Sequence, residues 1–164
     1  KFTPAQRALY MLVYEAQLAG FAAVKPGANF LDINRASQRV LAQGLADMGV
    51  LTVSAEESMK PEVGLHRRWT LHGVSHHLGL DVHDCEHARQ EMYRDGVLRE
   101  GMVLTVEPGL YIQPDDELFA PEYRGIGIRI EDDVIVTADG YRNLSEDIPR
   151  HPDAIEAWMA SILG

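Results

Sequence analysis

The spacing of the apolar residues changes once along this 164-residue chain, and this change constrains the fold more than any other feature. Up to Met48 the apolar residues recur at helical spacing, whereas from Val103 they alternate as residues in strands do. Helices first and strands later indicate an α+β domain with an antiparallel sheet and flanking helices. A chain of this length is large enough to bury a hydrophobic core.

The helical part of the pattern has clear start and stop signals. A first helix is predicted to begin after Thr3, which can cap it and form a capping box with Gln6. Pro4 suits the first helical position, and Lys25-Pro26-Gly27 ends the helix. Three further segments follow from the same signals: a helix over 31–48, a polar loop over 52–66 and a closing helix over 152–163.

The strand part is best defined between Gly125 and Glu131, where apolar and other residues alternate strictly. The three isoleucines of this segment face one way, and Gly127, Arg129 and Glu131 face the other way. Further strands are expected over 103–106, where Glu107-Pro108-Gly109 forms a turn signal, over 111–112 and over 134–136.

A histidine-rich run lies between these two parts, at 72–84. It contains His72, His76, His77 and His83 among glycines and apolar residues. His72 and His76 are four residues apart, which puts them on one side of the backbone in a helix or in a strand. Glu107 and Glu131 each end an apolar stretch, and a carboxylate next to a buried face needs a partner such as a metal ion. Imidazole and carboxylates without thiolate suit zinc, manganese or cobalt.

The charges of these residues limit the kind of metal site. Two dications carry four positive charges, whereas Glu107, Glu131 and one bridging hydroxide supply three negative ones. A two-metal site therefore needs at least one further carboxylate, but a one-metal site with His76, Glu107 and Glu131 is balanced. Alternatively, Arg129 and Glu131 form a weak ion pair on a solvated face, worth about 0–1 kcal/mol. Gly127 beside them favours a ligand or another chain close by.

The composition excludes several classes of partner. A net charge of -10 argues against nucleic acid or an anionic membrane as the main partner. No apolar run reaches the roughly 18 residues of a membrane span. The single cysteine excludes an internal disulfide and suits a reducing cytoplasm. The chain begins with Lys1, so we expect a piece of a longer protein.

Three stretches, at 72–84, 101–112 and 123–133, resemble the pita-bread metallopeptidases, and among them most closely the Xaa-Pro aminopeptidases. Residues 1–7 and 143–144 are also similar to that family. The resemblance runs from end to end. It implies an incomplete pita-bread fold, in which residues 1–164 form the C-terminal portion of the catalytic domain and the N-terminal domain and the first part of the catalytic domain are absent.

The resemblance also implies a role for each candidate residue. His76 would bind one metal, Glu107 would be a metal ligand near the attacking water, and Glu131 would bridge both metals. His72 and His83 would contact the substrate and stabilise the tetrahedral intermediate, and Arg129 would support the site through hydrogen bonds. The other histidines match no functional position and are expected to be structural or surface residues: His66, His77, His87 and His151.

The implied activity is release of an N-terminal residue linked to proline, with two divalent metal ions, manganese being preferred and zinc or cobalt being alternatives. The family's two aspartate ligands lie upstream of this chain, so the metal site is incomplete and the chain alone is expected to be inactive.

Expected partners are peptides with proline at the second position, the missing N-terminal part and further copies in a homo-oligomer. Ser75 leans towards the aminopeptidase over Xaa-Pro dipeptidase (prolidase), which stays open. A non-catalytic binding protein with the same fold is the alternative from another class.

Overall fold

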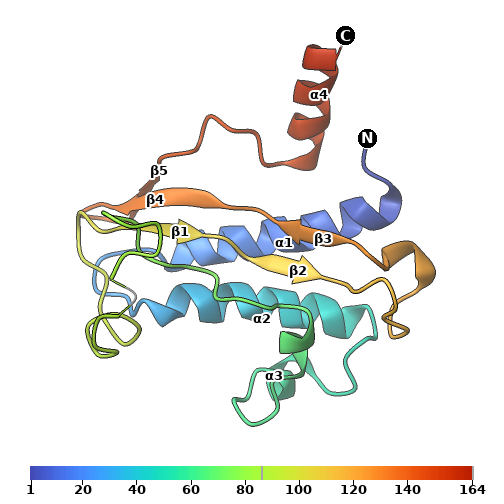
Figure 1. Ribbon diagram of the computed structural model, residues 1–164, viewed down its shortest axis with the longest axis horizontal. Coiled ribbons are helices and arrows are strands. Elements are labelled where there is room, and N and C mark those ends of the chain that lie inside the picture. Colours follow the sequence, from blue (N-terminus) through green and yellow to red (C-terminus); the bar gives the residue numbers. More distant parts are fainter. Residues whose placement is uncertain (86, 164) are drawn as a thin grey trace.

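The computed structural model describes residues 1–85 and 87–163, and it has the helices and strands of an α+β domain. In Figure 1 the two long helices lie side by side along the strands, and the last helix projects away from them. The helices are α1 (Pro4–Ala23), α2 (Leu31–Asp47), α3 (Ala55–Ser58) and α4 (Pro152–Leu163), with short 3-10 turns η1 (Leu65–Arg68) and η2 (Pro121–Tyr123). The strands are β1 (Val103–Val106), β2 (Gly109–Tyr111), β3 (Gly127–Arg129), β4 (Asp132–Val136) and β5 (Tyr141–Asn143).

The strands form two small sheets that are parts of one bent antiparallel ladder. One sheet has the order β1-β4-β5 and the other pairs β2 with β3, and every pairing is antiparallel, as expected. Val106 of β1 faces Asp132 of β4, and Gly109 of β2 faces Arg129 of β3. The ladder is interrupted between these two pairs, where Pro108 has no backbone N–H to donate.

Residues 74–78 of the histidine-rich run are extended and lie along the free edge of β1, and the rest of the run turns back. The amide N of Thr105 donates to the carbonyl of His76 at 2.9 Å, and the amide N of Glu107 donates to the carbonyl of Val74 at 2.8 Å. His77 also forms an antiparallel β-bridge with Leu104. The run is therefore an added edge segment beside β1, which settles the choice between helix and strand that its spacing left open.

The helix signals in the sequence are confirmed, with one exception. The Thr3 side chain accepts from the amide of Gln6, and the capping box is complete. The loop prediction over 52–66 is wrong in part, because α3 and the start of η1 fall within it. The signal was present at Ser54, whose Oγ accepts from the amide N of Glu57 at 3.1 Å and so caps the short helix.

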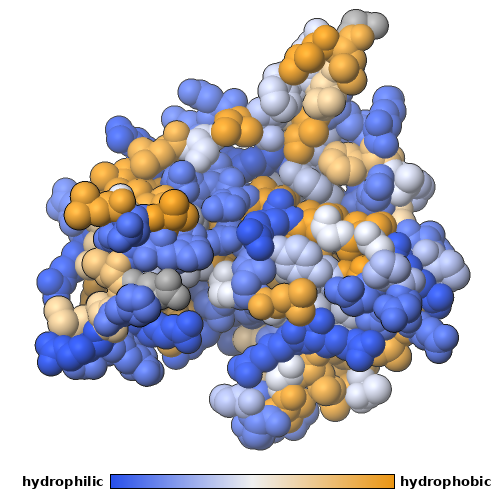
Figure 2. Space-filling model, in the orientation of Figure 1, coloured by the Kyte–Doolittle hydropathy of each residue, from blue (hydrophilic) through white to orange (hydrophobic). Residues whose placement is uncertain are grey.

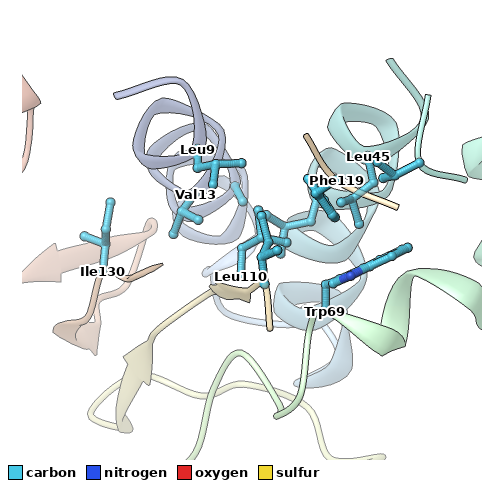
Figure 3. Close-up of a cluster of buried hydrophobic side chains, with 11 residues drawn as sticks. Leu9, Val13, Leu45, Trp69, Leu110, Phe119 and Ile130 are labelled. Carbon is cyan, nitrogen blue, oxygen red and sulfur yellow. The ribbon is translucent and has the colours of Figure 1, made fainter. Parts of the chain in front are cut away.

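Two clusters of buried side chains hold the helices against the strands. Figure 3 shows the first, in which side chains from α1, α2 and β2 point toward one another. The second lies under β1 and β4 and includes Phe21, Ile33, Leu104 and Val134. Full burial of one such side chain contributes about 1.5–3 kcal/mol, so these clusters fix the strands that carry the candidate site.

The closing helix α4 has the predicted bounds, but most of its apolar side chains are not covered. Trp158 is 49% exposed and Leu163 is 74% exposed. Figure 2 shows apolar atoms gathered along this projecting helix. Among the described residues, the structure has no helix that is both long and apolar enough to cross a membrane.

His66 links α3 to η1, and it makes the stability of the fold depend on pH. It is buried, and its Nδ1 lies 3.0 Å from the carbonyl oxygen of Ser58. Burial lowers the pKa of His66, so the unfolded chain binds a proton more readily than the folded chain. The stabilisation is present above about pH 6.5, the value of a free histidine, and is lost as the pH falls below it.

We predict that His66→Asn, which keeps a donor near the position of Nδ1, loses less free energy of unfolding between pH 7.5 and pH 5.5 than the wild type loses. Urea unfolding at the two pH values measures this difference. Equal losses in the two proteins would show that His66 does not carry the pH dependence.

Candidate metal centre

The antiparallel register of the strands brings the two glutamates together. Glu107 directly follows β1 and Glu131 directly precedes β4, and the pairing of Val106 with Asp132 makes them neighbours across the two strands. His76 comes from the added edge segment beside β1. One ligand atom from each of His76, Glu107 and Glu131 lies within 4.8 Å of the others. These three predicted metal ligands therefore lie together.

The carboxylate of Glu107 is buried and has a partner on each side. Its Oε1 accepts from Thr105 Oγ1 at 3.1 Å and lies 3.1 Å from His76 Nε2. Its Oε2 lies 3.7 Å from Nη1 of Arg129. Thr105 shares a face of the strand with Glu107, as the alternation predicts. Glu107 is thus held in one orientation by its neighbours.

The ring of His76 is oriented by its other nitrogen. Nδ1 lies 3.1 Å from the carbonyl oxygen of His77, and the amide N of His76 donates to Thr105 Oγ1 at 3.1 Å. A carbonyl partner fixes the proton on Nδ1, which leaves Nε2 to face the carboxylates as a ligand. Histidines that bind metals are commonly held in this way.

Glu131 is more exposed, and its charge is less well compensated. Partial burial of the carboxylate, and then the negative charge of Glu107, raise the pKa of Glu131. Arg129 and His76 act in the opposite direction. A divalent cation between the two carboxylates would remove this repulsion, because it places positive charge where both ligands face.

The donor set fits one divalent ion. One imidazole nitrogen and two carboxylates, without thiolate, suit zinc, manganese or cobalt. The two negative charges of the carboxylates balance the charge of one dication, but they leave the charge of a second dication unbalanced. Within residues 1–85 and 87–163, the metal-ligating cluster has these three members.

A second group of side chains lies beside the glutamates, and Tyr111 joins it together. The Tyr111 hydroxyl is 2.7 Å from Nε2 of His72 and accepts from Nε of Arg129 at 2.9 Å. His72 Nδ1 is 2.8 Å from the Gly73 carbonyl, so this ring is also fixed. Tyr111 is not among the site residues that the sequence motifs predict. The strand alternation could have found it, since it puts Tyr111 on the same face as Glu107.

Two glycines make room for this group. A Cβ on Gly109 would lie 2.5 Å from Oη of Tyr111 and 2.8 Å from Nε2 of His72. A Cβ on Gly127 would lie 3.2 Å from Cδ1 of Tyr111. The ring of Tyr111 therefore lies against one side of Gly127, while the glycine itself remains exposed.

The remaining predicted residues lie at different distances from the centre. The exposed ring of His83 lies 4.4 Å from the ring of His76, centroid to centroid, at an angle of 76°. His77 instead stacks on Phe30 at 4.9 Å, and burial lowers the pKa of His77. His66 is buried against Ser58. The structure thus brings His83 to the centre and points the other two rings elsewhere.

Comparison with known proteins gives one consistent result. Residues 1–138 match metallopeptidase family M24. Xaa-Pro aminopeptidase 1 of Streptomyces coelicolor is 56% identical over 163 residues, which cover 99% of this chain and 33% of that protein. Xaa-Pro aminopeptidase of Escherichia coli is 43% identical over 161 residues, which cover 98% of this chain and 35% of that protein.

Solved structures agree with the sequence matches. The structure of Pseudomonas aeruginosa aminopeptidase PepP superposes with a TM-score of 0.90 at 40% identity, covering 98% of this chain and 36% of that one. This match confirms the expected pita-bread fold. The chain spans about a third of the length of the curated relatives it matches. With the family match over residues 1–138 and this similarity in sequence and fold, the chain belongs to metallopeptidase family M24.

Proposed function

We propose that this chain is the C-terminal portion of the catalytic domain of a metal-dependent Xaa-Pro aminopeptidase, which releases an N-terminal residue linked to proline. The observation that carries the proposal is the cluster of His76, Glu107 and Glu131, whose ligand atoms lie within 4.8 Å of one another. The names of the relatives from Streptomyces coelicolor and Escherichia coli support the reaction and the substrate.

The complete protein is proposed to hold two divalent ions, with manganese preferred and zinc or cobalt as alternatives. His76, Glu107 and Glu131 would hold these ions, with Glu107 beside the attacking water and Glu131 shared between the two ions. The charge count requires further carboxylates, which we assign to the part of the protein that precedes this chain. A similar structure, zinc-substituted aminopeptidase P of Escherichia coli in complex with product, supports zinc as an alternative.

The bound metal ions would lower the pKa of a water molecule and polarise the scissile carbonyl. Glu107 then accepts the proton of the attacking water on its carboxylate, which Thr105 and Arg129 hold in place. His72 and His83 contact the substrate and stabilise the tetrahedral intermediate. Arg129 supports both the proposed metal ligands and the substrate-contacting histidines, because it contacts Glu107 and Tyr111.

We propose that the rest of the same polypeptide covers the apolar face of α4. This face borders a groove of about 540 Å³ that Phe2, Ile126, Ile128 and Met159 help to line. The relatives are about three times as long as this chain, so enough polypeptide exists to fill the groove.

Completed in this way, the protein is proposed to form homo-oligomers. The single cysteine supports a cytoplasmic location.

The metal centre is tested by Glu131→Gln in the full-length protein. The variant should lose at least one metal ion and lower kcat/KM on Xaa-Pro peptides by more than the roughly 10–100-fold typical of losing an outer partner. Metal analysis and release of the N-terminal residue with added Mn²⁺ measure the two effects. Glu122→Gln, at an exposed residue of η2, is the matched control and should behave as the wild type.

The same assay separates the alternatives. Cleavage restricted to dipeptides would indicate Xaa-Pro dipeptidase instead. A wild-type protein that is fully loaded with metal and releases nothing would indicate a non-catalytic binding protein.

The substrate-contacting group is tested by comparing two glycines. Gly109→Ala should lower kcat/KM by roughly 10–100-fold, because a displacement of about 1 Å in a positioning group can cost about 10² in rate. Gly127→Ala should have a smaller effect, since its Cβ would contact only Tyr111, at 3.2 Å. Both variants should keep their metal ions. Equal effects of the two substitutions would contradict the assigned role of His72 and Tyr111.

The isolated 164-residue chain is predicted to bind divalent metal weakly and to turn over no peptide. It supplies one imidazole and two carboxylates, which leave a second ion uncompensated. Isothermal titration with Mn²⁺ measures the stoichiometry. Tight binding of two ions per chain would contradict the assignment of ligands to the preceding part.

A further inference from the structure

Helix α1 carries one fully buried polar side chain directly beneath the metal centre. Gln17 is 0% exposed, and its Nε2 donates to three acceptors. These acceptors are the carbonyl oxygen of Val106 at 3.2 Å, the carbonyl oxygen of Ile130 at 3.3 Å and Oδ2 of Asp132 at 2.9 Å. A single amide group therefore contacts both strands at once.

The three acceptors are the immediate chain neighbours of the two glutamates. Val106 precedes Glu107, while Ile130 and Asp132 stand on either side of Glu131. The contacts of Gln17 lie at the point where the ladder is interrupted. At this point the ladder keeps one long backbone hydrogen bond, from the amide N of Ile130 to the carbonyl oxygen of Pro108 at 3.4 Å, and Gln17 adds contacts to both strands.

The orientation of the amide is dictated by its surroundings. Rotation of the group would turn Oε1 of Gln17 toward three oxygen atoms, so Nε2 must face the strands. In this orientation Oε1 has no hydrogen-bond partner in the described part of the chain. Burying such an acceptor is unfavourable, and an apolar side chain of similar size would avoid the cost. The stabilising contribution of Gln17 therefore comes from the contacts of Nε2.

The carboxylate of Asp132 is held in the same network. It is buried, and its Oδ2 also lies 3.4 Å from Nη1 of Arg150. Gln17 and Arg150 together fix this negative charge beneath the sheet, away from the cluster formed by Glu107 and Glu131. The network thus separates a third carboxylate from the two that face the metal.

We propose that Gln17 is a positioning residue for the metal centre: its amide fixes the spacing of Glu107 and Glu131 by joining the backbones that carry them. This inference rests on the proposed metallopeptidase function. Gln17 touches neither substrate nor metal, so its effect is expected in metal affinity first and in turnover as a consequence.

The test is Gln17→Leu in the full-length protein, with Gln17→Met as a second variant of similar size in case the first does not fold. The dissociation constant for Mn²⁺ should rise about 10–100-fold, the effect typical of losing an outer partner of a metal ligand. Calorimetric titration measures affinity and stoichiometry. The Mn²⁺ EPR spectrum distinguishes coupled pairs from single ions. Excess Mn²⁺ should restore most of the lost kcat/KM.

Gln38→Leu is the matched control. Gln38 is 6% exposed on α2, and its Oε1 also has no partner among the described residues. It contacts neither glutamate-bearing strand through a hydrogen bond in that part of the chain, so its substitution should leave Mn²⁺ affinity unchanged.

Wild-type Mn²⁺ affinity and EPR spectrum in a folded Gln17 variant would overturn the inference, and so would an equal loss of affinity in the Gln38 variant. The failure of the proposed function is seen separately. If the wild type binds Mn²⁺ but cleaves no Xaa-Pro peptide, the proposed reaction is wrong, while the affinities of the variants still decide the role of Gln17.

Discussion

The interruption of one antiparallel ladder is the constraint on which the rest of the structure depends. Strands β1 and β2 are joined through Glu107 and Pro108, and β3 and β4 through Ile130 and Glu131. Since Pro108 cannot donate to a ladder, regular pairing stops there and two carboxylates emerge side by side. The histidine-rich edge segment then approaches from one side and helix α1 from the other. The antiparallel register, which is the same on both sides of the interruption, keeps the two carboxylates next to each other.

Bringing two carboxylates together has an electrostatic cost that the neighbouring side chains offset only in part. Glu107 has Thr105, His76 and Arg129 around it, whereas partial burial and then the negative charge of Glu107 raise the pKa of Glu131. Any cation that binds this arrangement stabilises the folded state by mass action. A cation bound between the two carboxylates would therefore stabilise the folded state.

Local patterns predicted much of this structure, and long-range pairings account for what they missed. The capping box of α1 and the alternation over 125–131 are properties of neighbouring residues, and both are borne out. Tyr111 and Gln17 have partners far along the chain. The pairing of β2 with β3 brings Arg129 to Tyr111, and the pairing of β1 with β4 brings together the acceptors of Gln17. Gln17 also lies on the buried face of α1, among apolar residues, whereas a polar residue on a helix normally faces solvent. Helical or strand spacing along the sequence does not predict which residues of distant strands pair.

His76, Glu107 and Glu131 are the proposed metal ligands. Anomalous diffraction at the manganese edge, from crystals of the full-length protein grown with Mn²⁺, tests this most directly. The predicted result is two peaks that are both within coordination distance of Glu131, one of them also beside His76 Nε2 and Glu107. Fully occupied manganese elsewhere in the protein, with none at these three side chains, would contradict the account.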